Sequence, residues 1–537
     1  METAAVPRPE DADGTRRGFF RSPDPALLDT LRARQALADD GVRGTIEVVA
    51  PFTGEVAGAV PASTEADIME AARRARAAQP AWASSSFRDR ARIFLRLHDL
   101  LLRRQDEVMD LIQLETGKAR KDAFEEVADA AICCRYYAHT AERHLRSRRR
   151  QGTMPVLTRV WEHHHAVGLV GFITPWNYPL SMALSDVAPA LMAGNAVLLK
   201  PDHQTPFTTL WAARLADEAG LPRDLFQVVN GDGARIGAFV VEAVDHIAFT
   251  GSTAVGRIVA KRAAERLIGC SLELGGKNAL VVLDDADLVA AADAAVRGTF
   301  SNAGQLCVSM ERILVHERVF DEFARLFVER TRRMRVGADA GWDTEMGCLV
   351  SHAQLERVQA HYDDAVAKGA TVLCGGHTLP DVGPTFFEAT VLTDATPDMQ
   401  LFVRVTIGPI VALYPFASVD EAVERVNASR YGLNAAVWST NPRRAHRLAR
   451  RIQAGTVNIN ETYAAAWSSV DAPMGGFKDS GVGRRHGAEG ILRYTETQTV
   501  ARQHLLQLGP SKWLDGKRFR TVFTLVLKAL RRTPGIR

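Results

Sequence analysis

Residues 167–179 read VGLVGFITPWNYP, and the fold of the chain can be predicted outward from this stretch. The part that ends at Ile173 is apolar, which is typical of a strand buried on both faces of a sheet. The part from Thr174 to Pro179 follows directly and carries polar and aromatic side chains. We therefore predict a buried strand with a functional loop at its end.

The sequence pattern on both sides of this strand indicates an α/β protein. Before it, residues 66–137 have a helical pattern, and residues 147–152 are polar and basic. After it, short apolar runs alternate with amphipathic segments, which indicates a parallel sheet covered on both faces. The predicted strands are 196–200, 225–229 and 246–249, and the predicted helices are 208–219 and 254–266.

A second alternating set begins near residue 280 and continues to about residue 477. It includes a predicted helix at 319–334 and predicted strands at 411–414 and 456–460. A single hydrophobic core stops growing at roughly 250–300 residues, so a chain of 537 residues is expected to hold at least two domains. The sequence therefore predicts two α/β domains with a cleft between them.

The composition argues against several classes of function. A formal charge of +3 is nearly balanced and predicts neither nucleic-acid binding nor acidic substrates. Six irregularly spaced cysteines indicate no disulfide framework and no zinc site, so we expect a cytoplasmic protein in a reducing compartment. The N-terminus lacks the apolar core of a signal peptide, and no apolar run reaches the roughly 18 residues that would span a membrane.

Four segments carry residues that suit chemistry: 174–179 (TPWNYP), 249–256 (FTGSTAVG), 272–278 (LELGGKN) and 300–307 (FSNAGQLC). Each has an ordinary structural explanation when taken alone. The Gly-Ser-Thr turn is either a plain tight turn or a set of backbone N–H groups that holds a phosphate. A lone cysteine is more often packed and inert than nucleophilic. A lone glutamate beside two glycines is more often part of a solvated turn.

In this combination and order, the four segments resemble the aldehyde dehydrogenase superfamily. The resemblance runs from about residue 46 to residue 503 and includes Lys200-Pro201, NIN at 458–460 and PMGGFKDSG at 473–481. In style, CVSMER (307–312) and SGVGRRHG (480–487) are similar to the actinobacterial succinate-semialdehyde dehydrogenases. The resemblance implies an α/β fold with a Rossmann-like cofactor domain, an α/β catalytic domain and a small β oligomerisation element.

The resemblance also implies a division of the chain and an oligomer. The expected parts are a disordered or irregular N-terminal arm (1–40), an NAD(P)-binding domain (41–150 and 168–275), oligomerisation strands (151–167 and 491–505), a catalytic domain (276–490) and a basic amphipathic tail (506–537). Family members pair strands of this kind into homodimers and homotetramers. We predict no metal at His163-His164-His165, because consecutive residues of a strand point to opposite faces.

The catalytic roles follow from the family chemistry. The Cys307 thiolate would attack the aldehyde carbon, and the backbone dipoles of its Gly-containing turn are expected to lower its pKa. The Asn177 side chain and the Cys307 backbone N–H would form an oxyanion hole. Loss of hydride to the nicotinamide leaves a thioester, and Glu273 would then activate water to release the acid.

The resemblance assigns the cofactor to residues at the ends of the first set of strands. The expected contacts are Thr174, Trp176, Lys200, His203, Gly251, Ser252 and Leu274. Members that prefer NAD usually have a glutamate at the position of His203, where it binds the 2′-hydroxyl. Without that carboxylate, a 2′-phosphate meets no repulsion and can pair with Lys200, so NADP is favoured over NAD.

One departure from the family lies in the segment before Gly408. Counting back from Gly408, Val405 stands where the family usually has the glutamate that binds the nicotinamide ribose, and Ile407 stands where it has phenylalanine. Looser nicotinamide positioning and a slower hydride step are the expected consequences. A weakly active cofactor-binding homologue is therefore one alternative function. A CoA-acylating enzyme is another, which the presence of Glu273 disfavours.

A second departure concerns the substrate. Better-studied succinate-semialdehyde dehydrogenases hold the substrate carboxylate with two arginines, whose positions are Ser301 and Ser185 in this chain. Trp467, Ser468 and Ser469 are expected to shape the aldehyde tunnel instead. The predicted reaction is NAD(P)-dependent oxidation of a small-molecule aldehyde, with succinate semialdehyde as the named candidate. The alternative is another aliphatic or aromatic aldehyde.

The tail from residue 511 to residue 537 departs from the usual end of the family. Its apolar residues recur at helical spacing, namely Phe519, Val522, Phe523, Val526, Leu527 and Leu530. Eight Lys and Arg residues surround them, with Asp515 as the only acid. A basic amphipathic helix can lie on an anionic membrane surface, and the alternative is a helix docked on the protein itself.

Overall fold

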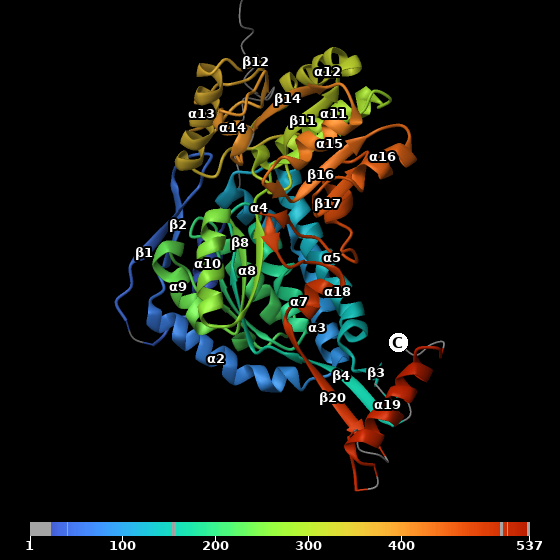
Figure 1. The fold of residues 1–537 in the computed structure, drawn as a ribbon. Helices are drawn as coiled ribbons and strands as arrows, with labels where there is room; N and C mark the ends of the chain where they lie inside the picture. Colours follow the sequence, from blue (N-terminus) through green and yellow to red (C-terminus); the bar gives the residue numbers. More distant parts are fainter. Residues whose placement is uncertain are drawn as a thin grey trace, which may run out of the picture.

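The computed structural model describes residues 23–39, 41–152, 154, 157–504, 509–512 and 514–533. In Figure 1 these residues form two large sheets with their helices, one above the other, and an arm that projects from the lower part. The predicted α/β fold class is confirmed.

The lower sheet has six strands in the order β19-β9-β8-β5-β6-β7. Its strands are β5 (Leu169–Ile173), β6 (Ala196–Lys200), β7 (Phe226–Val228), β8 (His246–Gly251), β9 (Gly269–Leu274) and β19 (Gly481–Val482). All are parallel except β19, which pairs antiparallel with β9. The chain leaves β5 toward β6 and β7 and returns to its other side with β8, so the order of connection reverses between β5 and β8. In open α/β sheets such a reversal opens a crevice at the carboxyl ends of the strands.

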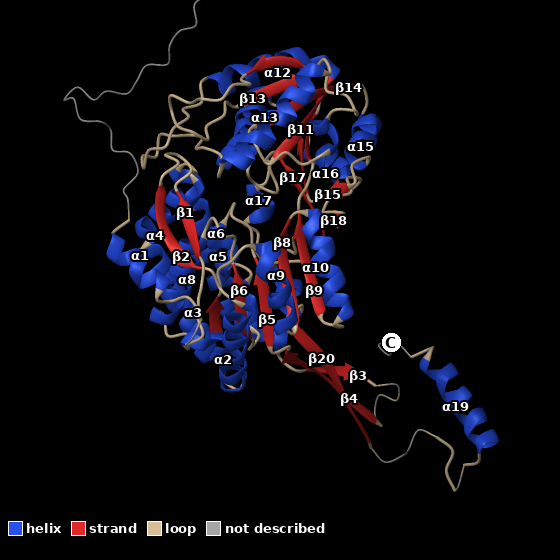
Figure 2. Ribbon diagram, turned by 90° about the vertical axis from the view of Figure 1, so that its left-hand side faces the viewer, coloured by secondary structure: helices blue, strands red, loops and turns tan. Residues whose placement is uncertain are grey.

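Helices cover both faces of the lower sheet, as Figure 2 shows. They are α2 (Glu65–Ala83), α3 (Phe87–Arg103), α4 (Gln105–Thr116), α5 (Arg120–Leu145), α6 (Pro179–Leu184), α7 (Val187–Met192), α8 (Pro206–Glu218), α9 (Gly233–Ala243), α10 (Thr253–Glu265) and α18 (Gly487–Leu492). Capping residues mark the ends of several of these helices. Thr64 and Asp67 form a capping box at the start of α2, and Gly117 ends α4 in the left-handed conformation. An antiparallel hairpin of β1 (Thr45–Val49) and β2 (Val56–Pro61) lies at the edge of this lower part of the molecule (Figure 1).

The upper sheet has seven strands in the order β12-β13-β14-β11-β10-β16-β17. They are β10 (Asn278–Val282), β11 (Met310–His316), β12 (Thr371–Cys374), β13 (Thr390–Thr393), β14 (Ile410–Phe416), β16 (Asn434–Trp438) and β17 (Thr456–Ile459). The accompanying helices are α11 (Leu288–Phe300), α12 (Phe320–Arg332), α13 (His352–Ala367), α14 (Gln400–Val403), α15 (Val419–Asn427), α16 (Pro442–Ala449) and α17 (Ala464–Trp467). A small sheet of β15 (Tyr431–Gly432) and β18 (Phe477–Lys478) completes this part.

The arm is a three-stranded antiparallel sheet in the order β20-β4-β3. It consists of β3 (Arg148–Gln151), β4 (Thr158–Ala166) and β20 (Thr495–Gln503), and β4 is paired along its whole length with β20. Residues 147–152 were described from the sequence only as polar and basic, with no strand predicted before residue 151. In the structure, residues 148–151 of this stretch form the third strand, β3. Most of β20 is exposed to solvent.

The prediction of a disordered or irregular arm over residues 1–40 is wrong for part of that range. Helix α1 (Pro25–Arg32) is ordered, and Leu28 and Leu31 are buried against the lower domain. Arg34 extends this contact through a bidentate ion pair with Asp217 on α8. Two buried leucines and a paired arginine are sufficient to dock so short a helix. The rest of the prediction, for residues 1–22 and residue 40, lies outside the described residues.

The tail contains the predicted helix, α19 (Gly516–Leu530), whose side chains are all at least partly exposed. In Figures 1 and 2 it projects beyond the arm and does not dock on the two large sheets. The parts of the tail prediction that fall on residues 506–508, 513 and 534–537 lie outside the described residues. Across the described ranges, no helix is both long and apolar enough to cross a membrane.

Glu115 joins two helices of the lower domain, and its loss should destabilise the protein. Its buried carboxylate accepts hydrogen bonds from the backbone N–H groups of Phe207 and Thr208, at the start of α8, where Thr205 provides no side-chain cap. We expect Glu115→Ala to lower the free energy of unfolding by about 2–4 kcal/mol, because two buried donors lose their acceptor. Denaturant titration followed by circular dichroism would measure this.

The exposed Glu265→Ala on α10 is the control for this experiment, and it should change stability by less than about 0.5 kcal/mol. Equal midpoints for the two variants would contradict the capping role of Glu115.

Candidate active site

Cys307 lies at the end of a tightly held loop between α11 and β11. The short helix η2 (Ser301–Gly304) opens this loop, and Asn302, Ala303 and Gly304 all have positive φ. Gly304 is required there, because a Cβ atom would lie 2.2 Å from the carbonyl oxygen of Gly408. The loop therefore turns sharply against the neighbouring backbone and presents Cys307, which is partly exposed among buried residues.

Side-chain amides fix the backbone of this loop. Asn278, the first residue of β10, donates from Nδ2 to the carbonyl oxygens of Cys307 and Ser309, both at 2.8 Å. Gln305 donates to the carbonyl oxygen of Cys348 at 3.1 Å and accepts from the N–H of Val350 at 3.0 Å. The nucleophile candidate is thus held by polar contacts with several elements of the upper domain.

Asn177 faces the same loop from the lower domain. Its side-chain Nδ2 donates to the carbonyl oxygen of Gln305 at 3.0 Å. Its backbone carbonyl oxygen accepts from Lys118 Nζ at 2.7 Å and Asn302 Nδ2 at 3.1 Å. A primary amide carries two N–H groups, so the second N–H is the candidate oxyanion donor. The structure brings Asn177 and the Cys307 loop together as the sequence predicts.

Glu273 lies near the end of β9, opposite Gly481 of β19. Its side chain is buried, and its Oε1 atom has no hydrogen-bond partner among the residues described. Burial raises the pKa of Glu273 to about 7, and the positive charges of Arg485 and Arg493 oppose the rise. A carboxyl group with a pKa near neutrality exchanges protons readily at physiological pH, as a general base must.

The pKa of Cys307 differs from the expectation. Burial raises the pKa of the thiol to about 11, although Arg485 and the backbone N–H groups of Cys307 and Val308 act in the opposite direction. The backbone contribution therefore has the expected sign, but desolvation is larger. The negative charge of the Glu273 carboxylate acts in the same direction as burial and raises the pKa of Cys307 further.

The residues predicted for the cofactor lie at the carboxyl ends of the lower strands. Thr174 follows β5, Lys200 ends β6, Gly251 ends β8 and Leu274 ends β9. Ser252 caps the N-terminus of α10 by accepting a hydrogen bond from the N–H of Val255. The remaining two predicted contacts, Trp176 and His203, lie in the loops after β5 and β6, and both are at least partly exposed.

These residues fit a dinucleotide. The 13-residue helix α10 directs its N-terminal N–H groups toward the reversal point of the sheet, which suits a pyrophosphate. The buried hydroxyl oxygen of Thr174 has no partner in the described part of the chain, so it is available to a ligand. Burial lowers the pKa of Lys200, whereas Asp202 and Asp232 oppose the decrease.

The two residues that depart from the family lie beside the catalytic strand. Val405 is packed near Gly275, which follows Leu274, and it presents only methyl groups there. The backbone N–H groups of Thr406 and Ile407 bind the carboxylate of Glu311 at 3.0–3.2 Å. The segment is therefore held through its backbone, without a polar side chain at position 405.

Cys307 packs against an aromatic cluster. Tyr178, Tyr463 and Trp467 belong to one packed group with the cysteine, and the Tyr178 and Trp467 rings meet edge-to-face at 5.8 Å. Trp467 is thus in the same cluster as Cys307, and its role toward the aldehyde stays a prediction. The hydroxyls of Ser468 and Ser469 instead donate to carbonyl oxygens of Ala464 and Ala465 on α17, at 2.7 and 2.6 Å.

Sequence analysis did not identify a polar group next to this cluster. The hydroxyl of Tyr463 lies 3.0 and 3.2 Å from the two carboxyl oxygens of Glu125 and 3.2 Å from Ser301 Oγ. Burial and the charge of Asp122 raise the pKa of Glu125 to about 7. Arg297 lies over the Tyr463 ring and forms an ion pair with Glu461. No local motif marks these residues, because α5, α11 and the segment around Tyr463 are distant in sequence.

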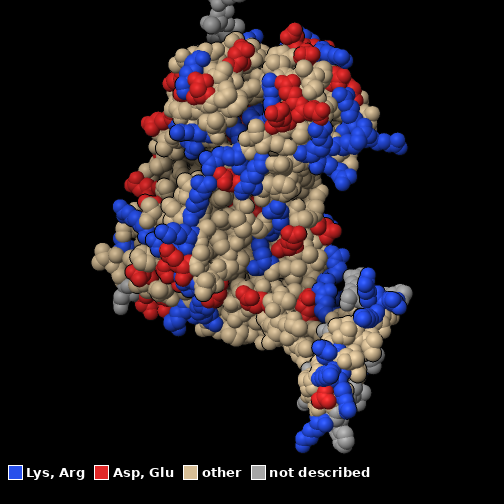
Figure 3. Space-filling view, viewed as in Figure 1, with Lys and Arg blue, Asp and Glu red and all other residues tan. Residues whose placement is uncertain are grey.

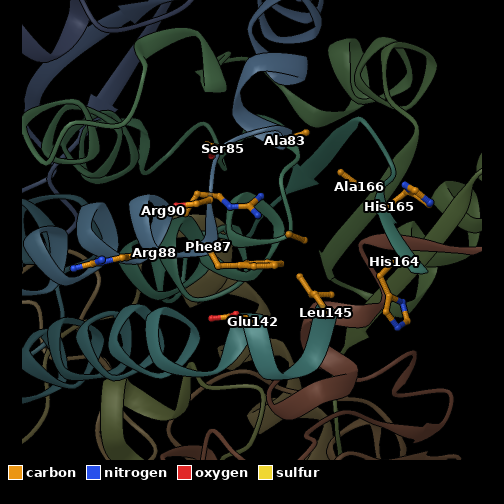
Figure 4. A pocket seen from close by; sticks show the side chains of 12 residues that line it. Ala83, Ser85, Phe87, Arg88, Arg90, Glu142, Leu145, His164, His165 and Ala166 are labelled. Atoms are coloured by element: carbon orange, nitrogen blue, oxygen red, sulfur yellow. The ribbon is translucent and has the colours of Figure 1, made fainter. Parts of the chain in front are cut away.

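Two other groups of residues lie outside the candidate active site. Figure 4 shows a pocket at the root of the arm, where Arg90 lies over the Phe87 ring, and none of its lining residues was predicted as a site residue. Asp129, Cys133 and His486 are buried with potential ligand atoms within 4.8 Å of one another. The charge of Arg485 already acts on Asp129 and Cys133, and this disfavours a metal cation there.

The fold and site are those of an α/β enzyme with a nucleotide-type sheet edge and a partly exposed thiol. The sequence profile of the aldehyde dehydrogenase family matches residues 38–500, and the chain belongs to that family. A Mycolicibacterium smegmatis protein with the provisional name succinate-semialdehyde dehydrogenase (NADP+) is 48% identical over 515 residues, which cover 96% of this chain and 100% of that protein. A Mycobacterium tuberculosis protein with the same provisional name, numbered 2, is 44% identical over 516 residues, with 96% and 100% coverage.

Solved structures agree with this assignment. An NAD-dependent aldehyde dehydrogenase from Sinorhizobium meliloti has a TM-score of 0.84 at 34% identity, covering 92% of this chain and 99% of that one. An Escherichia coli protein described as an NADP dependent enzyme has a TM-score of 0.84 at 32% identity, with 88% and 99% coverage. The predicted family is therefore confirmed.

The Asn278 amide should be needed to hold the nucleophile loop. Asn278→Ala removes both hydrogen bonds to the loop, and we expect kcat to fall about 100-fold, since a 1 Å misplacement of a reacting group can have an effect of that size. Initial rates of NAD(P)H formation would measure this.

Asn441→Ala is the matched control, because Asn441 caps the exposed N-terminus of α16. It should lower stability by about 1 kcal/mol and leave kcat unchanged. An unchanged kcat in Asn278→Ala would contradict the anchoring role.

Proposed function

We propose that this enzyme oxidises an aldehyde to a carboxylic acid through a thioester on Cys307, with water as the acyl acceptor. The observation that carries the proposal is the contact of Asn177 with the loop that ends at Cys307, together with a buried carboxyl, Glu273, whose charge acts on that thiol. These are the three groups that the family chemistry requires. The fold supports the assignment, because Glu273 lies near the carboxyl end of β9, at the edge of the lower sheet that suits a dinucleotide.

The residues suggest an order of events. Cys307 loses its proton and attacks the aldehyde carbon, and the resulting oxyanion receives hydrogen bonds from the Cys307 backbone N–H and the Asn177 amide. The nicotinamide, when bound, supplies the oxidation by accepting hydride from this carbon. Glu273 then takes a proton from water, which attacks the thioester, and Cys307 leaves as the acid is released.

We propose NADP as the preferred cofactor over NAD. Thr174, Trp176, Gly251, Ser252 and Leu274 would line its nicotinamide and pyrophosphate portions. Lys200 and His203 would bind the adenosine ribose, where no glutamate repels a 2′-phosphate. The names of the mycobacterial relatives support this preference. The Asp202 carboxylate lies 3.4 Å from His203 Nδ1, so an acidic group stands beside the proposed 2′-phosphate position.

Succinate semialdehyde is our first candidate substrate, because the mycobacterial relatives carry that name. Arg297, which lies over the Tyr463 ring and pairs with Glu461, is a cation beside the aromatic cluster that would receive its carboxylate. The carboxyl group of Glu125, which contacts Tyr463, favours a second candidate. That candidate is an aromatic or hydroxylated aldehyde of neutral charge, whose ring would pack among Tyr178, Tyr463 and Trp467.

Turnover should depend on Cys307 and Glu273 in different ways. We expect Cys307→Ala to form no NAD(P)H, and Glu273→Gln to release about one equivalent quickly and then turn over slowly, because the thioester persists. In the wild-type enzyme kcat should rise with pH through about 7, as Glu273 loses its proton, and Glu273→Gln should lack this rise.

The assay would compare succinate semialdehyde with a neutral aldehyde of similar length and with a hydroxybenzaldehyde, using NAD and NADP separately. The rate ratios would identify the substrate class and the cofactor. Turnover that requires added CoA would reject water as the acceptor. The absence of NAD(P)H with every combination would favour a cofactor-binding homologue that has lost efficient turnover.

We also propose a homodimer or homotetramer assembled through the arm. Strand β20 is an exposed edge strand, with Val500 42% exposed, and an edge of this kind is suited to pairing with a second copy. All six cysteines are free, which supports the proposed cytoplasmic location.

The helix α19 supports a second proposed contact, with an anionic membrane surface. Figure 3 shows Lys and Arg side chains over the projecting lobe that contains it. Its apolar residues include Val522, Leu525 and Leu527, which are 48%, 61% and 46% exposed. Phe519 and Phe523 stack at 5.3 Å between ring centroids. A basic helix with an uncovered apolar face binds the interface of anionic lipids.

Deletion of residues 511–537 should abolish this contact. We expect the full chain to co-sediment with vesicles that contain phosphatidylserine and not with phosphatidylcholine vesicles, and less so as salt increases. The double variant Val522→Asp/Leu525→Asp should behave like the deletion, because it charges the apolar face. Equal sedimentation of the full and shortened chains would reject membrane contact.

A further inference from the structure

Arg485 is a buried cation that follows β19 by three residues, and β19 pairs with β9 at Glu273. It lies just before α18, and its backbone is fixed by reciprocal hydrogen bonds with Met474 at 2.7 and 2.8 Å. Its side chain is 5% exposed, which is unusual for arginine unless the charge is paired. The partner is Asp186, between α6 and α7, at 3.3 Å.

Asp186 alone does not balance the charge around it. The same Oδ1 atom also binds Arg493 Nη2 at 3.0 Å, so one carboxylate serves two buried guanidinium groups. Arg485 Nη2 has no hydrogen-bond partner within the described part of the chain, and Glu273 Oε1 lacks one as well. A buried guanidinium N–H group of Arg485 and a buried carboxyl oxygen of Glu273 are thus both without a hydrogen-bond partner among the described residues.

We propose that Arg485 is a positioning residue of the reaction, whose buried guanidinium stabilises the negative charge of the Cys307 thiolate and of the Glu273 carboxylate. This inference rests on the proposed roles of those two residues. Arg485 does not itself react, and it acts by favouring the ionised form of each group when that form is needed.

The charges around Glu273 and Cys307 are consistent with this role of Arg485. Burial is the largest influence on both catalytic groups, and Arg485 is the charged group that opposes it most in each case. Around Glu273, Arg493 and Arg484 act in the same direction, and Asp186 acts against them. Around Cys307, Glu273 acts against Arg485. The charges of Asp186, Asp129, Glu273 and Cys133 favour the charged form of Arg485. Burial lowers the pKa of His486 to about 3, and the charge of Arg485 acts in the same direction.

The two catalytic charges need Arg485 at different stages. Before acylation Cys307 must be a thiolate, and a carboxylate at Glu273 raises the pKa of Cys307. Once the thioester has formed, the sulfur is uncharged, and Glu273 must hold a charge to take a proton from water. A guanidinium within the range of both groups lowers the cost of each charge without a change in fold.

The test is the pH dependence of alkylation of Cys307 by iodoacetamide in the cofactor-free enzyme. We expect Arg485→Met to move the alkylation midpoint up by about one pH unit, so that the rate at pH 8.5 falls about tenfold. The kcat limb that reports Glu273 should move upward as well. Arg485→Lys should recover part of both shifts, because it keeps the charge. Cys307→Ala measures the background from the other cysteines.

Two further variants separate this role from a structural one. Asp186→Asn should move both midpoints downward, because it removes the charge that opposes Arg485. Arg76→Met, which removes a surface ion pair with Asp245 elsewhere in the same domain, should move neither. A lower melting temperature in Arg485→Met with both midpoints unchanged would overturn the inference, as would an upward shift in Asp186→Asn.

The outcome is also distinguishable from failure of the proposed function. Alkylation reports the Cys307 thiol without any turnover. A shifted alkylation profile in an enzyme that oxidises no aldehyde would reject the proposed function and keep the electrostatic role of Arg485 toward Cys307. Normal aldehyde oxidation in Arg485→Met, with unshifted pH profiles, would keep the proposed function and reject the electrostatic role of Arg485.

Discussion

The side-chain amide of Asn278 is the contact on which the position of the nucleophile depends. It donates to the carbonyl oxygens of Cys307 and Ser309, and its own oxygen accepts from the N–H of Asn434 in β16. One residue thereby ties the loop to two neighbouring strands of the upper sheet. The same short segment, 273–278, carries the candidate base at one end and this anchor at the other. Base and nucleophile are therefore positioned by the junction between the two large sheets.

That junction is buried, and burial has opposite consequences for the two groups it positions. A dry site raises the pKa of Glu273 into the range where a base is useful, but it also raises the pKa of Cys307, which must ionise. The conflict is physical, because desolvation penalises every negative charge in the same region. Backbone N–H groups relieve it only in part. A cation that is itself buried, and therefore poorly screened by water, is the efficient remedy.

The sequence predicted the fold well because buried strands and amphipathic helices leave strong periodic patterns. It missed β3, since the run RRRQ has no apolar alternation and is a strand only through its pairing with β4. It misjudged residues 25–32, where only two of the three leucines of a short helix are buried, which gives little signal. The predicted Cys307, Glu273 and Asn177 stood in recognisable motifs. Glu125 and Arg485 did not stand out, because their meaning arises only when α5, β9 and the segment before α18 meet.

Backbone contacts hold the segment that contains Val405 and Ile407. Glu311 holds the N–H groups of residues 406 and 407, and its ion pair with Lys277 connects this segment to the end of the catalytic strand. Ile407 has a φ of 54°, a conformation that a β-branched residue adopts only when its surroundings impose it. The surrounding structure thus maintains the path of the chain at the energetic expense of this residue. Val405 presents methyl groups and no carboxylate toward Gly275. We therefore expect any loss of cofactor positioning to come from the side chain at residue 405, because the backbone of the segment is held by Glu311.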